Sequence, residues 1–372
     1  MKSIVIFGGT GFIGTHLAQA LLAANVPDRI YLVDLKGPVS DAYAEQLNLG
    51  LRTGRVVYVE HDVRNPVPNG LLPNEARVIF NLAAVHREPG HEAHEYFETN
   101  LLGAENVCAW AGAVGCQSVV FMSSIAPYGP CEEPKTEVSL PVPETPYGSS
   151  KLAAEKIHLT WQSAGDGRQL LILRPGVVFG PGEGGNVTRL IRSLTKGYFV
   201  YMGNRNTIKA AGYVKELSLV TLFGLEVLQK TGAPSLTLNF TMDPAPTVEQ
   251  IVDTVLRVTG KTANPLNMPR SLLLALSYPA AAIGTGLGLK VPINPVRVRK
   301  MFRSNNVVAE QLRQLNYQYT YSLESAFIDW MQDCPADFAM PEVATSGAEA
   351  QSRADSMNWE NARTMLPDVP KS

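Results

Sequence analysis

Short runs of apolar, β-branched residues recur along the first half of the chain, and amphipathic stretches separate most of them. Six runs have the pattern of buried strands, at residues 3–9, 29–35, 55–63, 76–84, 118–124 and 169–178. Helical periodicity marks the stretches 14–25, 99–114 and 149–163. Strands that alternate with helices predict a parallel sheet with helices on both faces, and near-continuous apolar strands fit a sheet that is buried on both sides. The expected fold class is α/β, built on a doubly wound parallel sheet.

The pattern changes after about residue 180, where glycine and proline become frequent and the elements become short and mixed. Residues 235–240 return as a strand, and Thr247 is a candidate N-cap for the helix that follows it. We therefore expect a first domain at 1–180, completed by parts of 213–240, and a smaller, interleaved mixed α/β substrate-binding domain at 181–330. Periodicity is lost from about residue 335, which predicts a loosely attached C-terminal tail over 335–372.

Composition narrows the function classes. The chain has 372 residues, of which 45% are hydrophobic, so it can bury a large core, and its net charge of -2 gives no footprint for nucleic acid. The four cysteines form no CxxC pair, no strong metal-ligand spacing appears among the histidines, and no secretory leader is visible. These features predict free thiols in a reducing cytoplasm and no bound metal.

One apolar segment needs separate treatment. Residues 271–289 carry no charge and approach the length of a membrane span, but Pro279 and three glycines interrupt them. A spanning helix broken in this way would need partners for its backbone groups. A buried helical hairpin or lid is the favoured interpretation, and contact with a membrane surface is the alternative.

A glycine-rich turn follows the first strand and opens the first helix. Gly8, Gly11 and Gly14 have the GxxGxxG spacing, which permits a tight turn, close approach of backbone to a pyrophosphate, and close helix–strand packing. Together with Phe12 and Ile13 at the helix start, they form the predicted cofactor site of a Rossmann domain.

Asp34 ends the second strand, 20 residues beyond Gly14. Its carboxylate can accept both ribose hydroxyls and would repel a 2′-phosphate, which favours NAD over NADP. Lys36 lies nearby and keeps NADP open.

Tyr147 and Lys151 are four residues apart and therefore share a face if this stretch is helical. A lysine ammonium close to the phenol would stabilise phenolate and lower the tyrosine pKa, giving a group able to exchange a proton with a hydroxyl. The spacing alone is also that of an ordinary helix pair. Ser123 and Ser124 end the fifth strand, at the sheet edge where doubly wound folds place substrate, and this context favours chemistry.

With "GGTGFIG", "HDVRN", "NLAA", "TNLLGAENV", "MSSIAPYG", "YGSSK" and "RPGVVFGPG" in this order, the chain resembles the extended short-chain dehydrogenase/reductase superfamily and, within it, the NAD-dependent epimerase/dehydratase family, over about residues 2–325. The resemblance implies that Ser124, Tyr147 and Lys151 are catalytic and that Lys151 also holds the nicotinamide ribose. It further implies a set of cofactor contacts: Asp62 and Val63 at adenine, Leu82, Ala83 and Ala84 along the groove, Asn100 near the active-site wall, and backbone of Pro175 and Val177 at the nicotinamide amide.

The residues after Ser124 discriminate among members of this family. Sugar-nucleotide dehydratases carry an Asp-Glu pair there, whereas this chain has Ile125 and Ala126, which transfer no protons. NAD-dependent epimerisation of a nucleotide-activated sugar, a UDP-hexose at C4, is the leading hypothesis. A 4-keto-sugar reductase and a 3β-hydroxysteroid-type dehydrogenase are enzyme alternatives, and a cofactor-sensing protein without chemistry is the alternative from another class.

The expected substrate contacts are spread over the second half of the chain. The resemblance places Asn186 at a nucleotide diphosphate, Lys209 where a phosphate-binding arginine is usual, and Arg299 as a possible second phosphate partner. His86 follows the fourth strand and could touch substrate or only bond backbone. The resemblance also implies a homodimer through the helices near 99–114 and 149–163.

Overall fold

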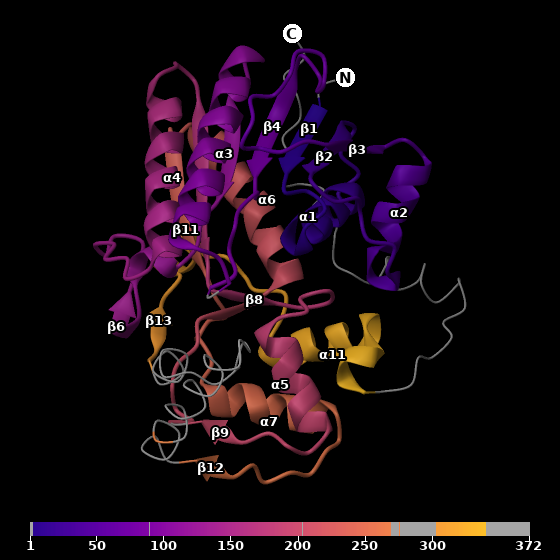
Figure 1. Ribbon diagram of the computed structural model, residues 1–372, viewed down its shortest axis with the longest axis vertical. Helices are drawn as coiled ribbons and strands as arrows, with labels where there is room; N and C mark the ends of the chain where they lie inside the picture. Colours follow the sequence, from indigo (N-terminus) through magenta and orange to yellow (C-terminus); the bar gives the residue numbers. More distant parts are fainter. Residues whose placement is uncertain (1–2, 89, 203, 269–274, 276–302, 340–372) are drawn as a thin grey trace.

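The computed structural model describes residues 3–88, 90–202, 204–268, 275 and 303–339 (Figure 1). A seven-stranded sheet forms its larger lobe, and every pair of neighbouring strands is parallel. From one edge to the other the strands are β11 (Ser235–Phe240), β7 (Gln169–Pro175), β5 (Ser118–Met122), β4 (Ala76–Asn81), β1 (Ser3–Phe7), β2 (Arg29–Asp34) and β3 (Val56–Glu60). The six strands expected in the first half of the chain are all present, and the predicted α/β fold class is confirmed.

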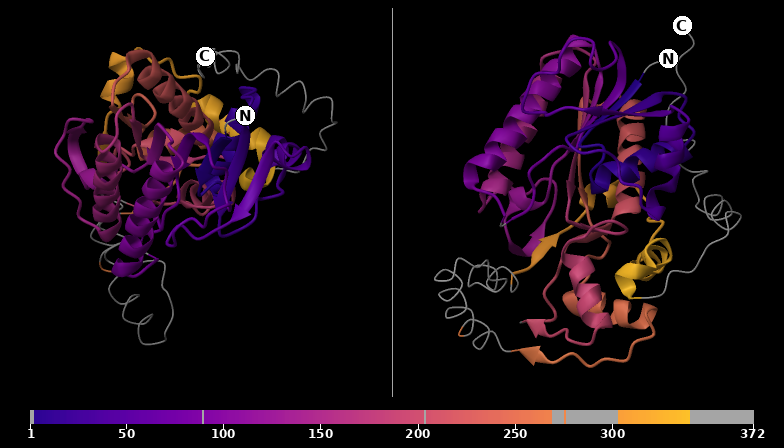
Figure 2. Two further views of the ribbon diagram at one scale, coloured as in Figure 1. Left: turned by 90° about the horizontal axis from the view of Figure 1, so that it is seen from above. Right: turned by 45° about the vertical axis from the view of Figure 1, so that its right-hand side comes forward.

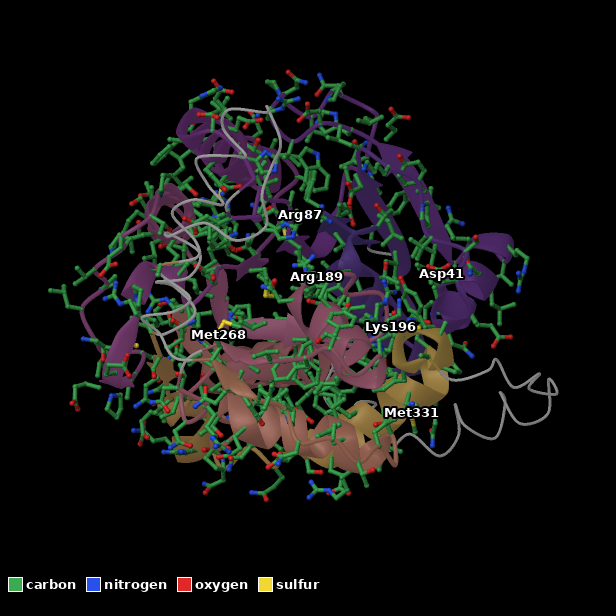
Figure 3. All side chains as sticks on the ribbon, turned by 60° about the horizontal axis from the view of Figure 1, so that its bottom comes forward. Asp41, Arg87, Arg189, Lys196, Met268 and Met331 are labelled. Atoms are coloured by element: carbon green, nitrogen blue, oxygen red, sulfur yellow. The ribbon has the colours of Figure 1, made fainter. Side chains whose placement is uncertain are left out.

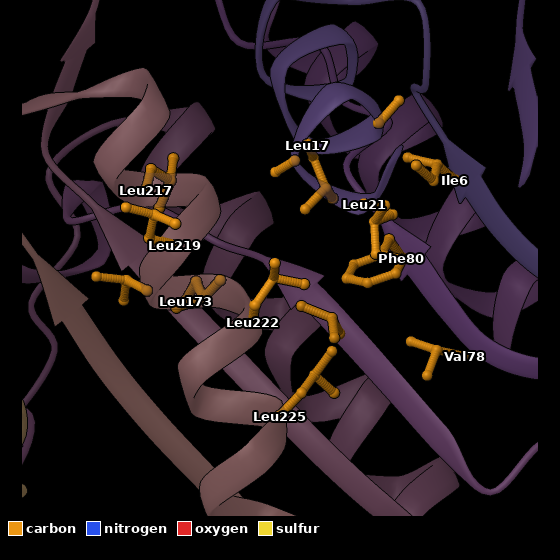
Figure 4. Close-up of a cluster of buried hydrophobic side chains, with 14 of the residues drawn as sticks. Ile6, Leu17, Leu21, Val78, Phe80, Leu173, Leu217, Leu219, Leu222 and Leu225 are labelled. Atoms are coloured by element: carbon orange, nitrogen blue, oxygen red, sulfur yellow. The ribbon is translucent and has the colours of Figure 1, made fainter. Parts of the chain in front are cut away.

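Helices cover both faces of the sheet (Figures 1 and 2). One face carries α1 (Phe12–Ala23), α2 (Glu45–Arg52) and α6 (Val214–Thr231), and the other carries α3 (Ala93–Ala113) and α4 (Pro146–Ser163). Alternate strand residues divide between two cores, because successive side chains of a strand point to opposite faces. Ile6 and Phe80 pack with Leu17 and Leu21 under α1 (Figure 4), whereas Phe7 packs under α3, edge-on to Trp110.

The smaller lobe lies beyond the carboxyl ends of the strands (Figure 1). Its core joins α5 (Asn186–Thr195), α7 (Val248–Val258) and α11 (Leu323–Asp333). Within the described residues, three two-stranded pairs accompany the main sheet: β8 (Val177–Phe179) with β10 (Ala211–Tyr213), β9 (Tyr201–Met202) with β12 (Asn267–Met268), and β6 (Cys131–Lys135) with β13 (Asn305–Val307). The same residues include the short helices η1 (Ala42–Ala44), η2 (Ala126–Tyr128), α10 (Glu310–Gln314) and η3 (Pro335–Phe338).

Capping side chains explain where the helices begin. Thr247 caps α7 in a reciprocal box with Gln250, as the sequence predicts. Helix α3 begins six residues before the expected start, because Glu92 and Glu95 form a capping box there. Helix α4 begins three residues early, at Pro146, because the Thr145 hydroxyl accepts a hydrogen bond from the Gly148 N–H. Tyr147 therefore lies in the first turn of α4.

The C-terminal part differs from the expected loose tail. Residues Pro335–Phe338 form η3, and Phe338 is fully buried against Trp330. The sequence shows no periodicity here because the segment is a single short turn held by tertiary packing. Residues 340–372 lie outside the described part of the chain, as does almost all of the apolar segment 271–289. No helix within the described ranges is long and apolar enough to cross a membrane.

Candidate active site

The glycine turn between β1 and α1 is built around close backbone contacts. Gly8 has a positive φ of 76°, and a Cβ there would stand 2.7 Å from the Ala83 nitrogen. A Cβ on Gly14 would stand 2.4 Å from the Gly8 carbonyl oxygen. Gly9, which sequence reasoning missed, is equally restricted, since its Cβ would stand 2.7 Å from the Ile6 carbonyl oxygen. The "GG" doublet could have revealed it.

Helix α1 begins next to this turn without a capping side chain and without an acidic residue in its first turn. The backbone N–H groups at its start, which include those of Phe12 and Ile13, are therefore available to an anion, and the helix dipole favours negative charge there. The glycine turn and the start of α1 together form a cradle, whose space a Cβ on the glycines would fill. This cradle fits the pyrophosphate of a dinucleotide.

Asp34 lies at the carboxyl end of β2, beside the glycine turn. Its Oδ2 accepts a hydrogen bond from the Thr10 N–H at 3.2 Å, and its Oδ1 accepts one from the Leu35 N–H at 2.8 Å. The Thr10 hydroxyl in turn donates to the Lys36 carbonyl at 2.7 Å. Thr10 is a second residue that sequence reasoning missed: it ties the glycine turn to the carboxylate expected at the ribose.

The residues expected at adenine are held by other groups. Arg64 makes a bidentate pair with Asp62, with Nη2 2.6 Å from Oδ2, and holds the pKa of that carboxyl below its usual value. Val63 is buried under α3, and its carbonyl accepts a hydrogen bond from Asn106 Nδ2 at 2.9 Å. Of these two residues, Val63 is buried and Asp62 is partly exposed, so a ligand can reach the exposed part of Asp62.

The loop after β4 carries Leu82, Ala83 and Ala84 beside the glycine turn, and Leu82 N–H donates to the Phe7 carbonyl. Asn100 of α3 braces this loop. Its Oδ1 accepts from the Val85 N–H at 2.9 Å, and its Nδ2 donates to the Ser150 hydroxyl of α4 at 2.8 Å. Asn100 therefore joins the cofactor loop to the helix that carries Tyr147.

The structure brings Ser124 and Tyr147 together, and it separates Ser123 from them. The Ser124 hydroxyl accepts from the Ala126 N–H at 3.1 Å and is a hydrogen-bond partner of the Tyr147 phenol. The Ser123 hydroxyl points into the core and donates to Glu155 Oε1 at 2.6 Å. Of the two serines, Ser124 is thus the one that shares a site with Tyr147.

Lys151 lies one helical turn after Tyr147 and is only 2% exposed. Its Nζ stands 4.5 Å from the centre of the Phe121 ring. Burial lowers the pKa of Lys151 to about 7, against the opposing charge of Glu155. Burial also raises the pKa of Tyr147 to about 12, although the Ser124 hydrogen bond opposes the rise. The expectation of a depressed phenol pKa is therefore wrong for the protein alone, because desolvation penalises the charged form of both groups.

The backbone expected at the nicotinamide amide is already engaged in part. The Pro175 carbonyl accepts from the Ile125 N–H at 3.0 Å, and the Val177 N–H donates to the Ala210 carbonyl at 2.7 Å. Each carbonyl oxygen has two lone pairs, so the Pro175 oxygen keeps one for a further donor.

The expected substrate residues have different surroundings. His86 is exposed, and its pKa is lowered by desolvation and by Arg87 and Lys151. The Lys209 Nζ donates to the Arg303 carbonyl at 2.7 Å, so this cation is partly committed to the fold. Arg299 lies outside the described residues.

Asn186 is the first residue of α5, and its Oδ1 accepts a hydrogen bond from Arg189 Nη2 at 2.7 Å. Figure 3 labels Arg189 and also Arg87 of the loop after β4; both side chains are exposed and they come from the two lobes. Sequence reasoning missed both arginines, since no motif marks them. Over the described ranges, no three His, Cys, Asp or Glu side chains gather where they could hold a metal ion.

Comparison with known proteins agrees with this geometry. The family model described as "NAD dependent epimerase/dehydratase family" matches residues 4–235. A relative from Escherichia coli O157:H7, named N-acetyl-alpha-D-glucosaminyl-diphospho-ditrans,octacis-undecaprenol 4-epimerase, is 26% identical over 86% of this chain and 92% of its own length. The UDP-glucose 4-epimerase of Vibrio cholerae is 31% identical over 53% of this chain and 58% of its own length.

Among solved structures, a UDP-glucuronic acid 4-epimerase from Bacillus cereus in complex with NAD superimposes with a TM-score of 0.68. It is 19% identical, and the match covers 91% of this chain and all of that one. This likeness confirms the Rossmann fold.

Proposed function

This chain belongs to the NAD dependent epimerase/dehydratase family, and from that premise we propose that it uses NAD to epimerise a nucleotide-activated sugar, a UDP-hexose at C4. The observation that carries the proposal is the pairing of Ser124 with Tyr147 beside a dinucleotide cradle. Ser124 is followed by Ile125, the N-cap of η2, and Ala126, its first residue, and neither can act as the acid or base that water elimination needs.

Each member of the site has a separate role in this proposal. When bound, NAD supplies reversible hydride exchange with the carbon that carries the hydroxyl. The Tyr147 oxygen takes the proton of that hydroxyl and gives it back, and Ser124 holds the hydroxyl by a hydrogen bond. Lys151 supplies the positive charge that a phenolate at Tyr147 requires. Lys151 is buried, so water does little to screen its charge from the phenol.

The substrate contacts remain part of the proposal. Asn186 and Arg189 on α5 offer an amide and a guanidinium to a diphosphate, and Lys209 keeps N–H groups beyond the one that the Arg303 carbonyl takes. His86 and Arg299 complete the proposed set. We also place the protein in the cytoplasm, where its four free cysteines are stable, and pair α3 and α4 across a homodimer.

A second candidate substrate is a sugar joined by a diphosphate to a polyprenol. The relative with 86% coverage is named for such a compound, whereas the UDP-glucose 4-epimerase covers 53% of the chain. The charge-free segment 271–289 is also suited in composition to a lipid. The chemistry at Tyr147 would be the same, and only the group beyond the diphosphate would differ.

The test is to purify the protein, measure retained NAD, and supply UDP-hexoses, UDP-N-acetylhexosamines and polyprenyl-diphosphate N-acetylglucosamine in detergent. Interconversion of two UDP-sugar epimers without net NADH supports the first candidate, and turnover of the lipid-linked sugar alone supports the second. Stoichiometric NADH consumption with a keto sugar would replace the epimerase with a reductase, and oxidation of a sterol would replace it with a dehydrogenase.

Tyr147→Phe tests the proton-transfer role. The variant should retain NAD and lose about 10²–10⁴-fold in kcat, the range typical of a lost acid–base group. Tyr96→Phe is the matched control: this ring lies 6.0 Å from that of Tyr147, and its hydroxyl donates to the Arg87 carbonyl at 2.6 Å. Tyr147→Phe with full activity would remove the assignment.

A further inference from the structure

A carboxylate lies under the proposed active site, on the side away from the cleft. Glu155 follows Lys151 by one turn of α4 and is 2% exposed. An ionised group buried to this degree must be paired and hydrogen-bonded. The family resemblance and the proposed reaction assign it no part.

The two partners of Glu155 come from the ends of neighbouring strands, β5 and β7. Its Oε1 accepts from the Ser123 hydroxyl at 2.6 Å and from Arg174 Nε at 2.8 Å, and its Oε2 accepts from Arg174 Nη2 at 2.7 Å. Arg174 belongs to β7, and its Nη1 donates to the Tyr128 phenol at 2.6 Å. Tyr128 in turn donates to Asn239 of β11 at 2.9 Å. Both carboxylate oxygens are therefore used, and the network joins α4 to the ends of two central strands.

Ser123 connects this network to the reacting groups. It follows β5 directly, and its neighbour Ser124 is the hydrogen-bond partner of Tyr147. A carboxylate that holds the Ser123 side chain in the core directs Ser124 to the opposite side, toward the phenol. Glu155 also belongs to α4, the helix that carries Tyr147 and Lys151. Its carboxylate therefore fixes the position of Ser124 relative to Tyr147.

Charge gives Glu155 a second role. Lys151 and Arg174 are both buried cations, and Glu155 is the acid whose charge favours the protonated form of Lys151. His158 on α4 and His86 after β4 also respond to the Lys151 charge, and Tyr147 lies one turn before it on α4. None of these three groups is an anion near neutral pH.

We propose that Glu155 is a positioning residue of the active site: its carboxylate orients Ser124 through Ser123 and supplies the buried negative charge that keeps Lys151 a cation. The inference rests on the proposed function for the roles of Ser124, Tyr147 and Lys151. It adds that the buried ion pair between Glu155 and Arg174, out of contact with substrate, fixes the arrangement of the reactive groups.

The first measurement needs no sugar. Carbon-13 NMR of lysine-labelled, NAD-loaded protein is followed against pH, and comparison with the Lys151→Met spectrum identifies the Lys151 signal. In Glu155→Gln the titration midpoint of Lys151 should fall by about one pH unit, because loss of the carboxylate favours neutral Lys151. An unchanged midpoint in folded Glu155→Gln overturns the charge role whatever the substrate is.

Turnover then tests the orienting role. Ser123→Ala leaves the Glu155–Arg174 pair intact, and kcat should fall about tenfold with KM and retained NAD unchanged. Asp28→Asn is the matched control. Asp28 directly precedes β2, at the end of the strand away from the glycine turn, and forms a buried ion pair with Arg77 at 2.8 Å. Breaking this pair should change stability but neither the titration midpoint nor kcat. Wild-type kcat in Ser123→Ala would overturn the orienting role. Wild-type protein that turns over no sugar, while the Lys151 midpoint still shifts in Glu155→Gln, would instead contradict the proposed function alone.

Discussion

Two buried histidines should make the fold sensitive to mild acid. His158 lies in α4 between the Ala154 carbonyl, 2.8 Å from Nδ1, and the Asn81 amide nitrogen, 3.2 Å from Nε2. A neutral ring with its proton on Nδ1 satisfies both partners, since it donates to the carbonyl and accepts from the amide. Burial lowers the pKa of His158 to about 4, and burial lowers the pKa of His16 on α1 to about 4 as well.

The sign follows from proton binding in the two states. The unfolded chain binds a proton at each histidine near pH 6.5, whereas the folded chain binds it only near pH 4. Stability is therefore complete above pH 6.5 and is lost as the pH falls toward 4. For these two pKa values, the free energy of unfolding should fall between pH 7 and pH 5 by about 2 kcal/mol for each histidine, or about 4 kcal/mol for both.

Urea unfolding at pH 7, 6 and 5 measures this loss. His158→Gln removes one titrating ring, so the variant should be less stable at pH 7 but should lose about 2 kcal/mol less than wild type on going to pH 5. His94→Gln, on the exposed surface of α3, is the control and should follow the wild-type curve. Parallel curves for wild type and His158→Gln would refute the reasoning, because they would mean that the ring does not titrate differently in the two states.

Further predictions concern the cofactor cradle and the C-terminal turn. Gly14→Ala should cost about 1–3 kcal/mol in urea unfolding, because its Cβ would meet the Gly8 carbonyl at 2.4 Å. Gly11→Ala, with a nearest contact of 3.3 Å, should cost less than Gly14→Ala, and an equal loss in the two variants would contradict the packing argument. Asp34→Asn should reduce the preference for NAD over NADP by about tenfold in fluorescence titrations, since the charge that repels a 2′-phosphate is removed; an unchanged ratio would assign that preference to another group. Phe338→Ala should lower the free energy of unfolding by about 3–5 kcal/mol, as expected for a fully buried aromatic side chain, and a loss under 1 kcal/mol, far below that range, would show that η3 is attached loosely after all.

Local patterns were sufficient for the framework. Each of the six expected strands is present because an apolar run of this length has few other ways to be buried, and Asp34 ends β2 as its place in the sequence predicts. The helix starts were less accurate, since Glu92 and Thr145 act as caps through local hydrogen bonds that a periodicity argument ignores. The domain boundary at residue 180 and the roles of the site residues remain predictions.

The sequence by itself determined the alternation of strands and helices, the glycine turn and the four-residue spacing of Tyr147 and Lys151, because each depends on residues close together in the chain. Only the tertiary structure decided how those groups behave. Desolvation by distant elements raises the pKa of Tyr147 and lowers that of Lys151. Ser123 is turned into the core by Glu155, 32 positions away, and Lys209 is committed to the Arg303 carbonyl, 94 positions away. Burial and long-range hydrogen bonds depend on residues that only folding brings together. A short stretch of sequence therefore cannot predict the pKa shifts and partners that they cause.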